Sequence, residues 1–145
     1  MSQARTDAVV VDTMAVSALV NASRRPDRAA AYGEVIAGQP IVVSFVTVTE
    51  LRYGALRAGW GELRRRGLER DLAQFVIVQP DDVLMRTCAE LRVSCEGAGL
   101  GLGQKIHEAD RWIAATAIRL KVDLVTADGV FDDVPGLTVR KPGLA

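Results

Sequence analysis

The sequence has few of the residues from which soft-metal sites, disulfide scaffolds and aromatic binding platforms are built. Its 145 residues include two cysteines, Cys88 and Cys95, and a single histidine, His107. The cysteines form no CxxC pair and the three residues match no known zinc-ligand spacing, which excludes both a zinc site and a disulfide scaffold. Any bound metal ion must therefore have oxygen ligands. The two cysteines lie on one predicted helix, and we expect them to be buried or at a dimer contact.

An excess of charge of one sign and long apolar runs are also missing. The 18 basic and 18 acidic side chains give a formal net charge of zero, which excludes a generally basic nucleic-acid coat but not a local basic patch. No run approaches the roughly 18 uncharged apolar residues of a membrane-spanning helix. The first residues lack the basic region and apolar segment of a targeting signal. We expect a soluble, cytoplasmic protein that makes no membrane contact.

The remaining composition is that of one folded domain over residues 1–145, with 49% hydrophobic and 25% charged residues. Brief β-branched runs predict strands at 9–11, 41–43, 76–78, 124–125 and 137–139. Longer segments between them predict helices at 16–38, interrupted near Pro26, and at 46–58, 62–75, 82–97 and 108–121. This alternation indicates an α/β fold with a mostly parallel sheet. The glycine-rich segment 97–103 has no GxGxxG register and predicts a helix end and a mobile loop.

Two carboxylates lie just after predicted strands. Asp12 comes after 9–11, and Asp128 comes after 124–125. Ligands of open parallel sheets bind at the carboxyl ends of the strands, so these two acids would flank a binding site if their strands are neighbours. Each also has an ordinary structural role available, because Asp12 or Thr13 can cap a helix and Asp128-Gly129 is a common turn.

Two further acids lie on predicted helices. Glu50 has Gly54 one turn later, which leaves space beside its carboxylate, although an exposed helical glutamate is the ordinary alternative. Asp110 shares its helix face with an apolar stripe formed by Ile113, Ala114 and Ala117. A carboxylate on such a stripe is unfavourable unless it is paired or bound to a cation, but its place in the first turn also stabilises it through the helix dipole.

The combination of the four acids is more informative than any one of them. Several carboxylates in one cleft repel each other, and a divalent cation removes that repulsion. Mg²⁺ and Mn²⁺ prefer oxygen ligands and retain water molecules that can act as nucleophiles. Hydrolysis of phosphodiesters is the reaction that most naturally uses such a site.

The segments that contain these acids resemble the PIN domain and, within it, the VapC toxins of bacterial toxin–antitoxin pairs. The most specific parts are the Asp-x-x-Ile-Ala-Ala-Thr-Ala block and its spacing to Thr-x-Asp. The match extends nearly from end to end through Val11-Asp12-Thr13, Thr47-Val48-Thr49-Glu50-Leu51 with Gly54, Asp110 to Ala117, and Leu124 to Asp128 with Phe131.

The resemblance implies a three-layer α/β/α sandwich whose four- to five-stranded sheet has the order 3-2-1-4-5. It also implies an endoribonuclease that depends on Mg²⁺, for which Mn²⁺ may substitute, and a cognate VapB-like antitoxin whose tail covers the cleft. Carried over residue by residue, the metal-site acids would be Asp12, Glu50 and Asp110, with Asp128 as the fourth and Asp132 or Asp133 as its alternatives. Thr13 and Thr126 would position carboxylates or water, metal-activated water would be the nucleophile, and His107 is expected at the surface or an interface.

RNA needs local basic charge to approach an acidic cleft. The candidates are Arg64, Arg65 and Arg66 with Arg70, and Arg24 and Arg25 with Arg28, although solvated helix faces with ion pairs account for both groups equally well. Aromatic residues make up only 5% of the chain, which argues against a stacking platform and favours structured RNA, such as a tRNA or rRNA loop. A homodimer and a toxin–antitoxin hetero-oligomer are expected.

Two other hypotheses fit parts of the sequence. A catalytically idle module could act through antitoxin binding alone. A receiver-like domain that accepts phosphate on an aspartate is suggested by Lys141-Pro142 near the end of the chain, but its other characteristic acids are not convincingly present.

Overall fold

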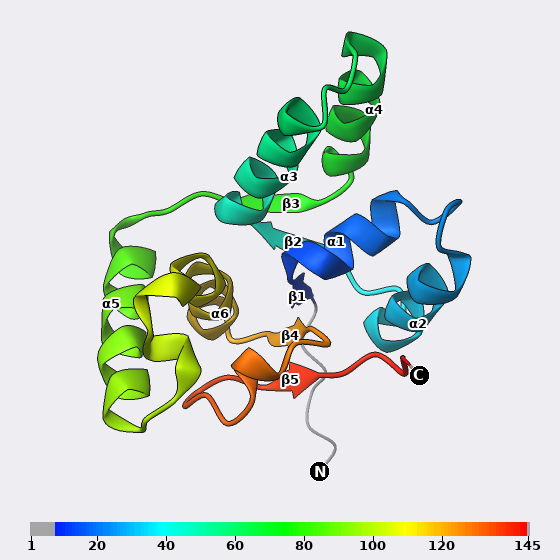
Figure 1. The fold of residues 1–145 in the computed structure, drawn as a ribbon. Helices are drawn as coiled ribbons and strands as arrows, with labels where there is room; N and C mark the ends of the chain where they lie inside the picture. The colour runs from blue at the N-terminus through cyan, green and yellow to red at the C-terminus, as the bar shows by residue number, and fades with distance from the viewer. Residues whose placement is uncertain (1–7, 145) are drawn as a thin grey trace.

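The computed structural model describes residues 8–144, so the prediction about a targeting signal falls largely outside the described residues. Within that range, five parallel strands form one sheet with the order β3-β2-β1-β4-β5. The strands are β1 (Val9–Val11), β2 (Ile41–Ser44), β3 (Val76–Val78), β4 (Asp123–Val125) and β5 (Val139–Arg140) (Figure 1). The predicted sheet and its strand order are confirmed.

Helices precede and follow the strands much as the sequence predicts. They are α1 (Thr13–Val20), α2 (Pro26–Ile36), α3 (Phe45–Arg57), α4 (Glu62–Leu72), α5 (Asp82–Gly97) and α6 (Glu108–Leu120), with 3₁₀ turns η1 (Gly101–Gly103), η2 (Lys105–His107) and η3 (Gly129–Phe131). The helix α1 begins earlier than predicted because Asp12 caps it. The strand β5 begins later than predicted because Leu137 bonds to Val134 in a turn before β5 pairs with β4.

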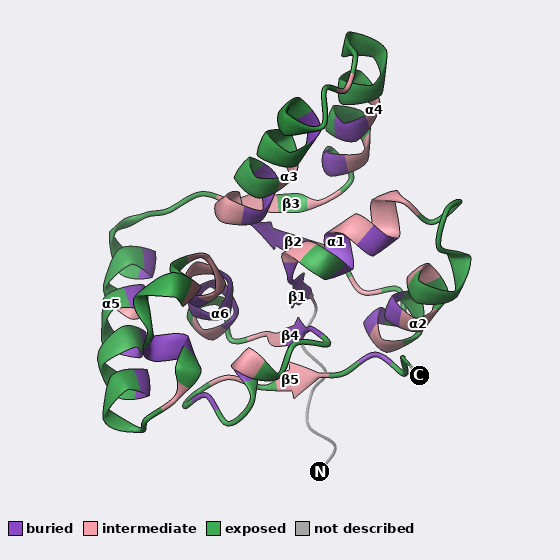
Figure 2. Ribbon diagram, viewed as in Figure 1, coloured by how far each residue is buried: buried purple, intermediate pink, exposed green. Residues whose placement is uncertain are grey.

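Successive residues of the central strands face opposite sides of the sheet, and this alternation produces two cores. Val9 and Val11 pack with residues of α1–α4 on one side, whereas Val10 packs with residues of α5 and α6 on the other. Figure 1 shows α1 and α2 on one side of the sheet and α5 and α6 on the other, with α3 and α4 projecting as a pair. Figure 2 shows the central strands buried and the outer surfaces of α4 and α5 exposed.

The carboxyl ends of the central strands and the first turns of three helices meet at one edge of the sheet. Asp12 joins β1 to α1, and Ser44 joins β2 to α3 and caps it. The first turns of α3 and α6 are held together by an edge-to-face contact between Phe45 and Trp112, whose ring centroids are 5.3 Å apart. No helix within residues 8–144 is long and apolar enough to cross a membrane.

Candidate active site

Asp12 is a buried carboxylate at the junction of β1 and α1, and it is only 5% exposed. Its Oδ1 accepts a hydrogen bond of 2.8 Å from the backbone N–H of Ala15, which caps α1. Its Oδ2 accepts a hydrogen bond of 2.5 Å from the hydroxyl of Thr126. Within residues 8–144 no basic side chain forms an ion pair with it. Burial raises the pKa of Asp12 despite these hydrogen bonds, so a nearby cation would strongly stabilise the ionised form.

Thr126 connects Asp12 to the second acid that follows a strand. Its hydroxyl is fully buried, donates to Asp12 and accepts a hydrogen bond of 3.0 Å from the backbone N–H of Asp128. Asp128 in turn caps η3 by accepting from the N–H of Val130 at 2.9 Å. Asp12 and Asp128 follow the neighbouring strands β1 and β4, and the charge of Asp128 adds to the effect of burial in raising the pKa of Asp12.

The contacts of Asp132 differ from those of Asp128. A carboxylate oxygen of Asp132 lies 2.8 Å from Nζ of Lys141, so its charge is already paired. This pairing supports Asp128, and not Asp132, as the fourth acid of the cluster.

Glu50 of α3 is hydrogen-bonded to Thr13 of α1. The hydroxyl of Thr13 donates to Oε1 of Glu50 at 3.1 Å and lies 3.0 Å from the hydroxyl of Thr47. Because a hydroxyl has only one proton, Thr47 must donate to Thr13. Glu50 is exposed as a residue, but partial burial of its carboxylate raises its pKa, and the charges of Asp110 and Asp12 raise it further.

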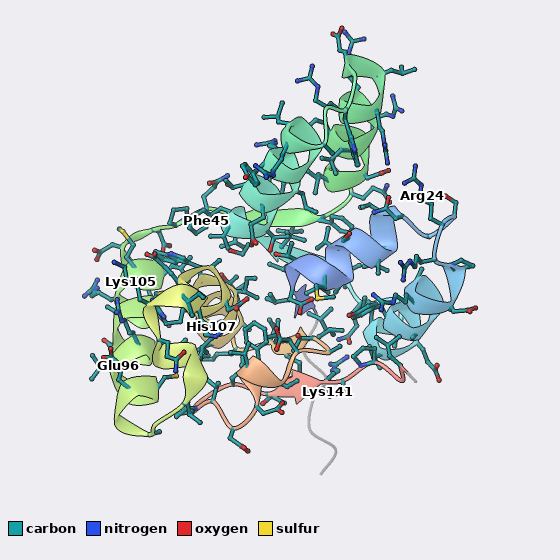
Figure 3. All side chains as sticks on the ribbon, viewed as in Figure 1. Arg24, Phe45, Glu96, Lys105, His107 and Lys141 are labelled. Atoms are coloured by element: carbon teal, nitrogen blue, oxygen red, sulfur yellow. The ribbon has the colours of Figure 1, made fainter. Side chains whose placement is uncertain are left out.

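Asp110 lies half-buried in the first turn of α6, as the sequence predicts. Its Oδ2 is 3.1 Å from Nδ1 of His107, which precedes it by three residues. His107 is labelled in Figure 3, beside the start of α6. This contact was not predicted from the sequence, although the spacing of three residues at a helix start could have indicated it. His107 therefore supports a proposed site residue in addition to lying near the surface.

The four acids form one electrostatic cluster rather than a preformed cage. Asp12 is affected by the charges of Asp128 and Asp110, and Glu50 by those of Asp110 and Asp12. In the described part of the chain, no three His, Cys, Asp or Glu side chains converge closely enough to hold a metal ion as they stand. The donors are nevertheless all carboxylate oxygens, and the most buried of them, on Asp12, has no basic partner among residues 8–144. This donor set fits a hard divalent cation such as Mg²⁺ or Mn²⁺.

Arg111 and the glycine-rich segment position the start of α6, a role that the sequence did not reveal. Arg111 is 2% exposed and donates to the carbonyl oxygens of Leu102 and Gln104. A Cβ on Gly103 would lie 2.8 Å from the backbone nitrogen of Glu96. The prediction of a mobile loop over 97–103 is therefore wrong for its second half, where buried residues pack closely against α5.

The arginines expected to contact RNA divide into two groups. Arg24, Arg25 and Arg64 line one groove beside α1. Arg65 and Arg66 line a different groove, between α3 and α4, where Arg66 pairs with Glu62. Cys88 and Cys95 are both buried and unpaired, in agreement with one of the two predicted placements.

Comparisons with known proteins identify relatives over nearly the whole chain. A family model described as "PIN domain" matches residues 9–137. No curated protein matches the chain. Among solved structures, the chain is similar to VapBC2 from Rickettsia felis, which was solved bound to a DNA fragment from the VapBC2 promoter. The identity is 25% and the TM-score is 0.76, and the match covers 93% of this chain and 98% of that chain.

Two other structures extend this similarity. VapBC-5 from Mycobacterium tuberculosis, a member of the VapBC family of toxin–antitoxin systems, is 25% identical with a TM-score of 0.64, and the match covers 96% of this chain and 100% of that chain. VapBC-1 from nontypeable Haemophilus influenzae has the same fold, with 22% identity, a TM-score of 0.71, and coverage of 92% and 97%.

Proposed function

Because this chain belongs to the PIN domain family, whose members are nucleases, we propose that it is a metal-dependent endoribonuclease and the toxin of a toxin–antitoxin pair. The observation that carries the proposal is the buried carboxylate of Asp12, which has no basic partner among residues 8–144 and lies in electrostatic range of Asp128 and Asp110. Such an arrangement is unfavourable for folding alone and is suited to binding a cation.

The residues of the cluster have distinct proposed roles. Asp12, Glu50, Asp110 and Asp128 would hold Mg²⁺, or Mn²⁺ in its place. When bound, the ion would activate water and offset charge that develops on the phosphodiester. Thr126 fixes the Asp12 carboxylate, and Thr13 fixes that of Glu50.

The proposed substrate is structured RNA, such as a loop of tRNA or rRNA, cut at an exposed single-stranded position. At the proposed cutting site, His107 would orient the carboxylate of Asp110 through the contact between its Nδ1 and Oδ2 of that residue. The low aromatic content of 5% agrees with recognition by shape and backbone more than by extensive base stacking.

The proposed partner is a VapB-like antitoxin. The similar structures from Rickettsia felis, Mycobacterium tuberculosis and Haemophilus influenzae are VapBC complexes, and the one from Rickettsia felis is bound to DNA. We therefore expect a homodimer of this chain that joins its antitoxin in a hetero-oligomer. The protein would act in the cytoplasm, where its RNA substrate and its antitoxin meet.

The receiver-like hypothesis is not supported by the strand order. The sheet order β3-β2-β1-β4-β5 differs from the 2-1-3-4-5 order of phosphoacceptor receiver folds. The second candidate function is a catalytically idle module that only binds its antitoxin, and an activity measurement separates it from the nuclease.

The test is incubation of the purified chain with total cellular RNA in Mg²⁺, in Mn²⁺ or in chelator, followed by mapping of new 5′ ends by sequencing. Asp110→Asn removes one proposed ligand with little change in volume, and Asp132→Asn is a matched control because Asp132 pairs with Lys141. We expect discrete metal-dependent cuts from the parent and the control but none from Asp110→Asn. Absence of cuts from folded, antitoxin-free protein would favour the idle module, and full activity of Asp110→Asn would refute the site.

A further inference from the structure

A groove beside α1 collects arginines that are far apart in the sequence. Its volume is about 420 Å³, and four of its nine lining residues are arginines. They come from the segment between α1 and α2, from the first turn of α2 and from α4. The four are Arg24, Arg25, Arg28 and Arg64.

The lining of this groove is basic, although Asp27 lies with Arg24, Arg25 and Arg28 along an adjoining groove. No acidic side chain is among the lining residues. In the part of the chain that the structure describes, none of the four arginines forms an ion pair. Arg64 instead lies over the ring of Trp60, with its guanidinium carbon 3.7 Å from the ring centroid. Four like charges in one groove repel each other, and a bound polyanion relieves that repulsion.

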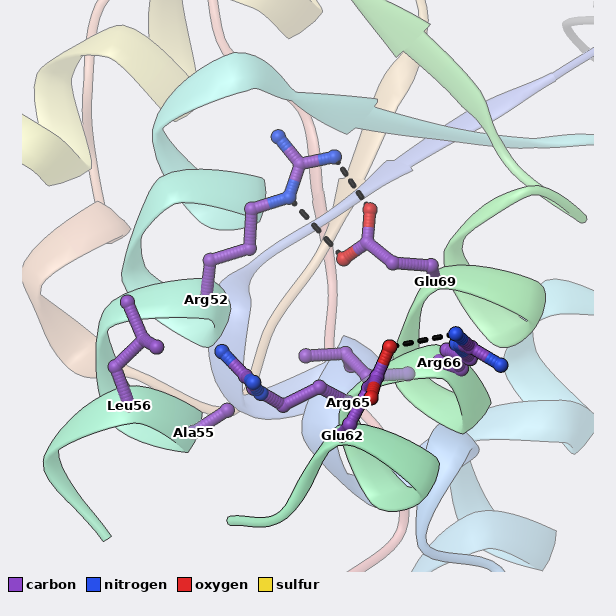
Figure 4. Close-up of a pocket in the computed structure, with 8 residues that line it drawn as sticks. Arg52, Ala55, Leu56, Glu62, Arg65, Arg66 and Glu69 are labelled. Carbon is purple, nitrogen blue, oxygen red and sulfur yellow. Dashed lines mark hydrogen bonds and ion pairs between the residues drawn. The ribbon is translucent and has the colours of Figure 1, made fainter. Parts of the chain in front are cut away.

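The neighbouring groove between α3 and α4 contains glutamates as well as arginines (Figure 4). Arg52 pairs with Glu69 at 2.6 Å, and Arg66 pairs with Glu62 at 2.5 Å. These guanidinium groups already have carboxylate partners. Arg65 also lines this groove and forms no ion pair among residues 8–144, so the paired Arg66, and not Arg65, is the control for charge removal.

The arginine groove begins beside the acid cluster. Met14 lines the groove and directly follows Thr13, whose hydroxyl contacts Glu50. Asn21 lies at the other end of α1, which places it roughly 13 Å from Asp12 at ~1.5 Å per residue. Figure 1 shows α1 leading from the sheet toward the segment that joins it to α2, and Figure 3 labels Arg24 at that far end.

We propose that this groove binds a single-stranded segment of RNA through its phosphates and leads it to the acid cluster, an inference that rests on the proposed nuclease function. Guanidinium groups bind phosphates through paired hydrogen bonds. Asn21 and Ser17 supply polar groups for base edges or ribose hydroxyls, which single-stranded RNA exposes. An acidic protein segment has complementary charge too, but the position beside the proposed catalytic acids favours RNA.

The test measures how RNA binding depends on salt. A short fluorescein-labelled unstructured RNA is titrated with the full chain in chelator, so that binding is observed without cleavage. For single strands, the slope of log affinity against log salt falls by about 0.7 for each phosphate contact that is lost. We expect Arg25→Gln and Arg28→Gln each to reduce the slope by about that amount, and Arg66→Gln to keep the slope of the parent. Equal losses in all three variants, or unchanged slopes in the two groove variants, would overturn the inference.

Two further measurements complete the test. One identifies the occupant of the groove as RNA or as an acidic protein segment, and the other separates failure of the groove proposal from failure of the proposed nuclease function. If a labelled oligoglutamate peptide loses binding in the groove variants while RNA binding persists, the groove serves an acidic protein segment and the inference is wrong. With Mg²⁺ present, we expect the groove variants to raise KM for RNA cleavage and leave kcat unchanged. Reduced salt slopes in a protein that cuts no RNA would refute the nuclease function and keep the RNA groove. Normal cutting by groove variants with unchanged slopes and KM would refute the groove alone.

Discussion

Replacing Thr126 by valine removes one hydroxyl group that fastens two of the proposed metal-site acids. Thr126 is fully buried, and its hydroxyl donates to the Asp12 carboxylate and accepts from the N–H of Asp128. A hydrogen bond to a charged group contributes about 1.5–3 kcal/mol and a neutral one about 0.5–1.5 kcal/mol. Valine has nearly the same volume, so no cavity forms. The expected loss in the free energy of unfolding is therefore about 2–4 kcal/mol.

Urea unfolding in chelator measures this loss directly. The matched control is Thr87→Val, because the Thr87 hydroxyl makes a solvent-exposed hydrogen bond to the carbonyl of Val83 in its own helix. We expect the control to change stability by less than about 0.5 kcal/mol. In thermal unfolding, Thr126→Val should lower the melting temperature by roughly 4–16 °C at this chain length. If Thr126→Val unfolds within about 0.5 kcal/mol of the parent, the hydroxyl does not fasten the site.

Three further substitutions test other parts of the structure. Burial raises the pKa of Asp12 in the folded state. The protonated carboxyl group therefore stabilises the fold below the ordinary aspartate pKa of about 3.9, and this stabilisation is lost as pH rises through the raised pKa. In chelator, the parent should therefore lose stability relative to Asp12→Asn between that pKa and neutral pH, and parallel stability curves would contradict this. Arg111→Met leaves the carbonyl oxygens of Leu102 and Gln104 without their donor, and we expect a loss of about 2–4 kcal/mol and faster amide exchange over η1. Unchanged exchange over η1 would show that these bonds do not hold the segment. Gly103→Ala places a Cβ against the backbone of α5 and should destabilise by at least about 1–3 kcal/mol in denaturant, whereas Gly97→Ala, with open space around it, should be nearly neutral.

The sheet was predictable because its strands are short β-branched runs, of which Val9-Val10-Val11 is buried on both faces. The exact ends of elements were not. The start of α1 depends on the hydrogen bond between Ala15 and Asp12, and the start of β5 depends on pairing with β4, a contact that local sequence does not specify.

Proximity of the acids was predictable in outline, because Asp12 and Asp128 follow strands that neighbour each other in the sheet. The side chains that hold these acids in place were harder to predict from the sequence. The bond between Thr126 and Asp12 joins residues 114 positions apart. The burial of Arg111 depends on the carbonyl groups of a folded-back segment, and the arginine groove unites Arg24 with Arg64 across two helices. Such long-range pairings arise from packing and leave no periodic signal in the sequence.

The central claim is that Asp12, Glu50, Asp110 and Asp128 form one site for a divalent cation. Titration of Mn²⁺ into the full chain, with free Mn²⁺ followed by electron paramagnetic resonance, tests it without any substrate. We expect the parent and Asp132→Asn to bind Mn²⁺ alike. Asp12→Asn should lose at least the ~10–100-fold in affinity that removal of an outer-shell partner produces. Equal binding by all three proteins, or no binding by the parent, would contradict the claim.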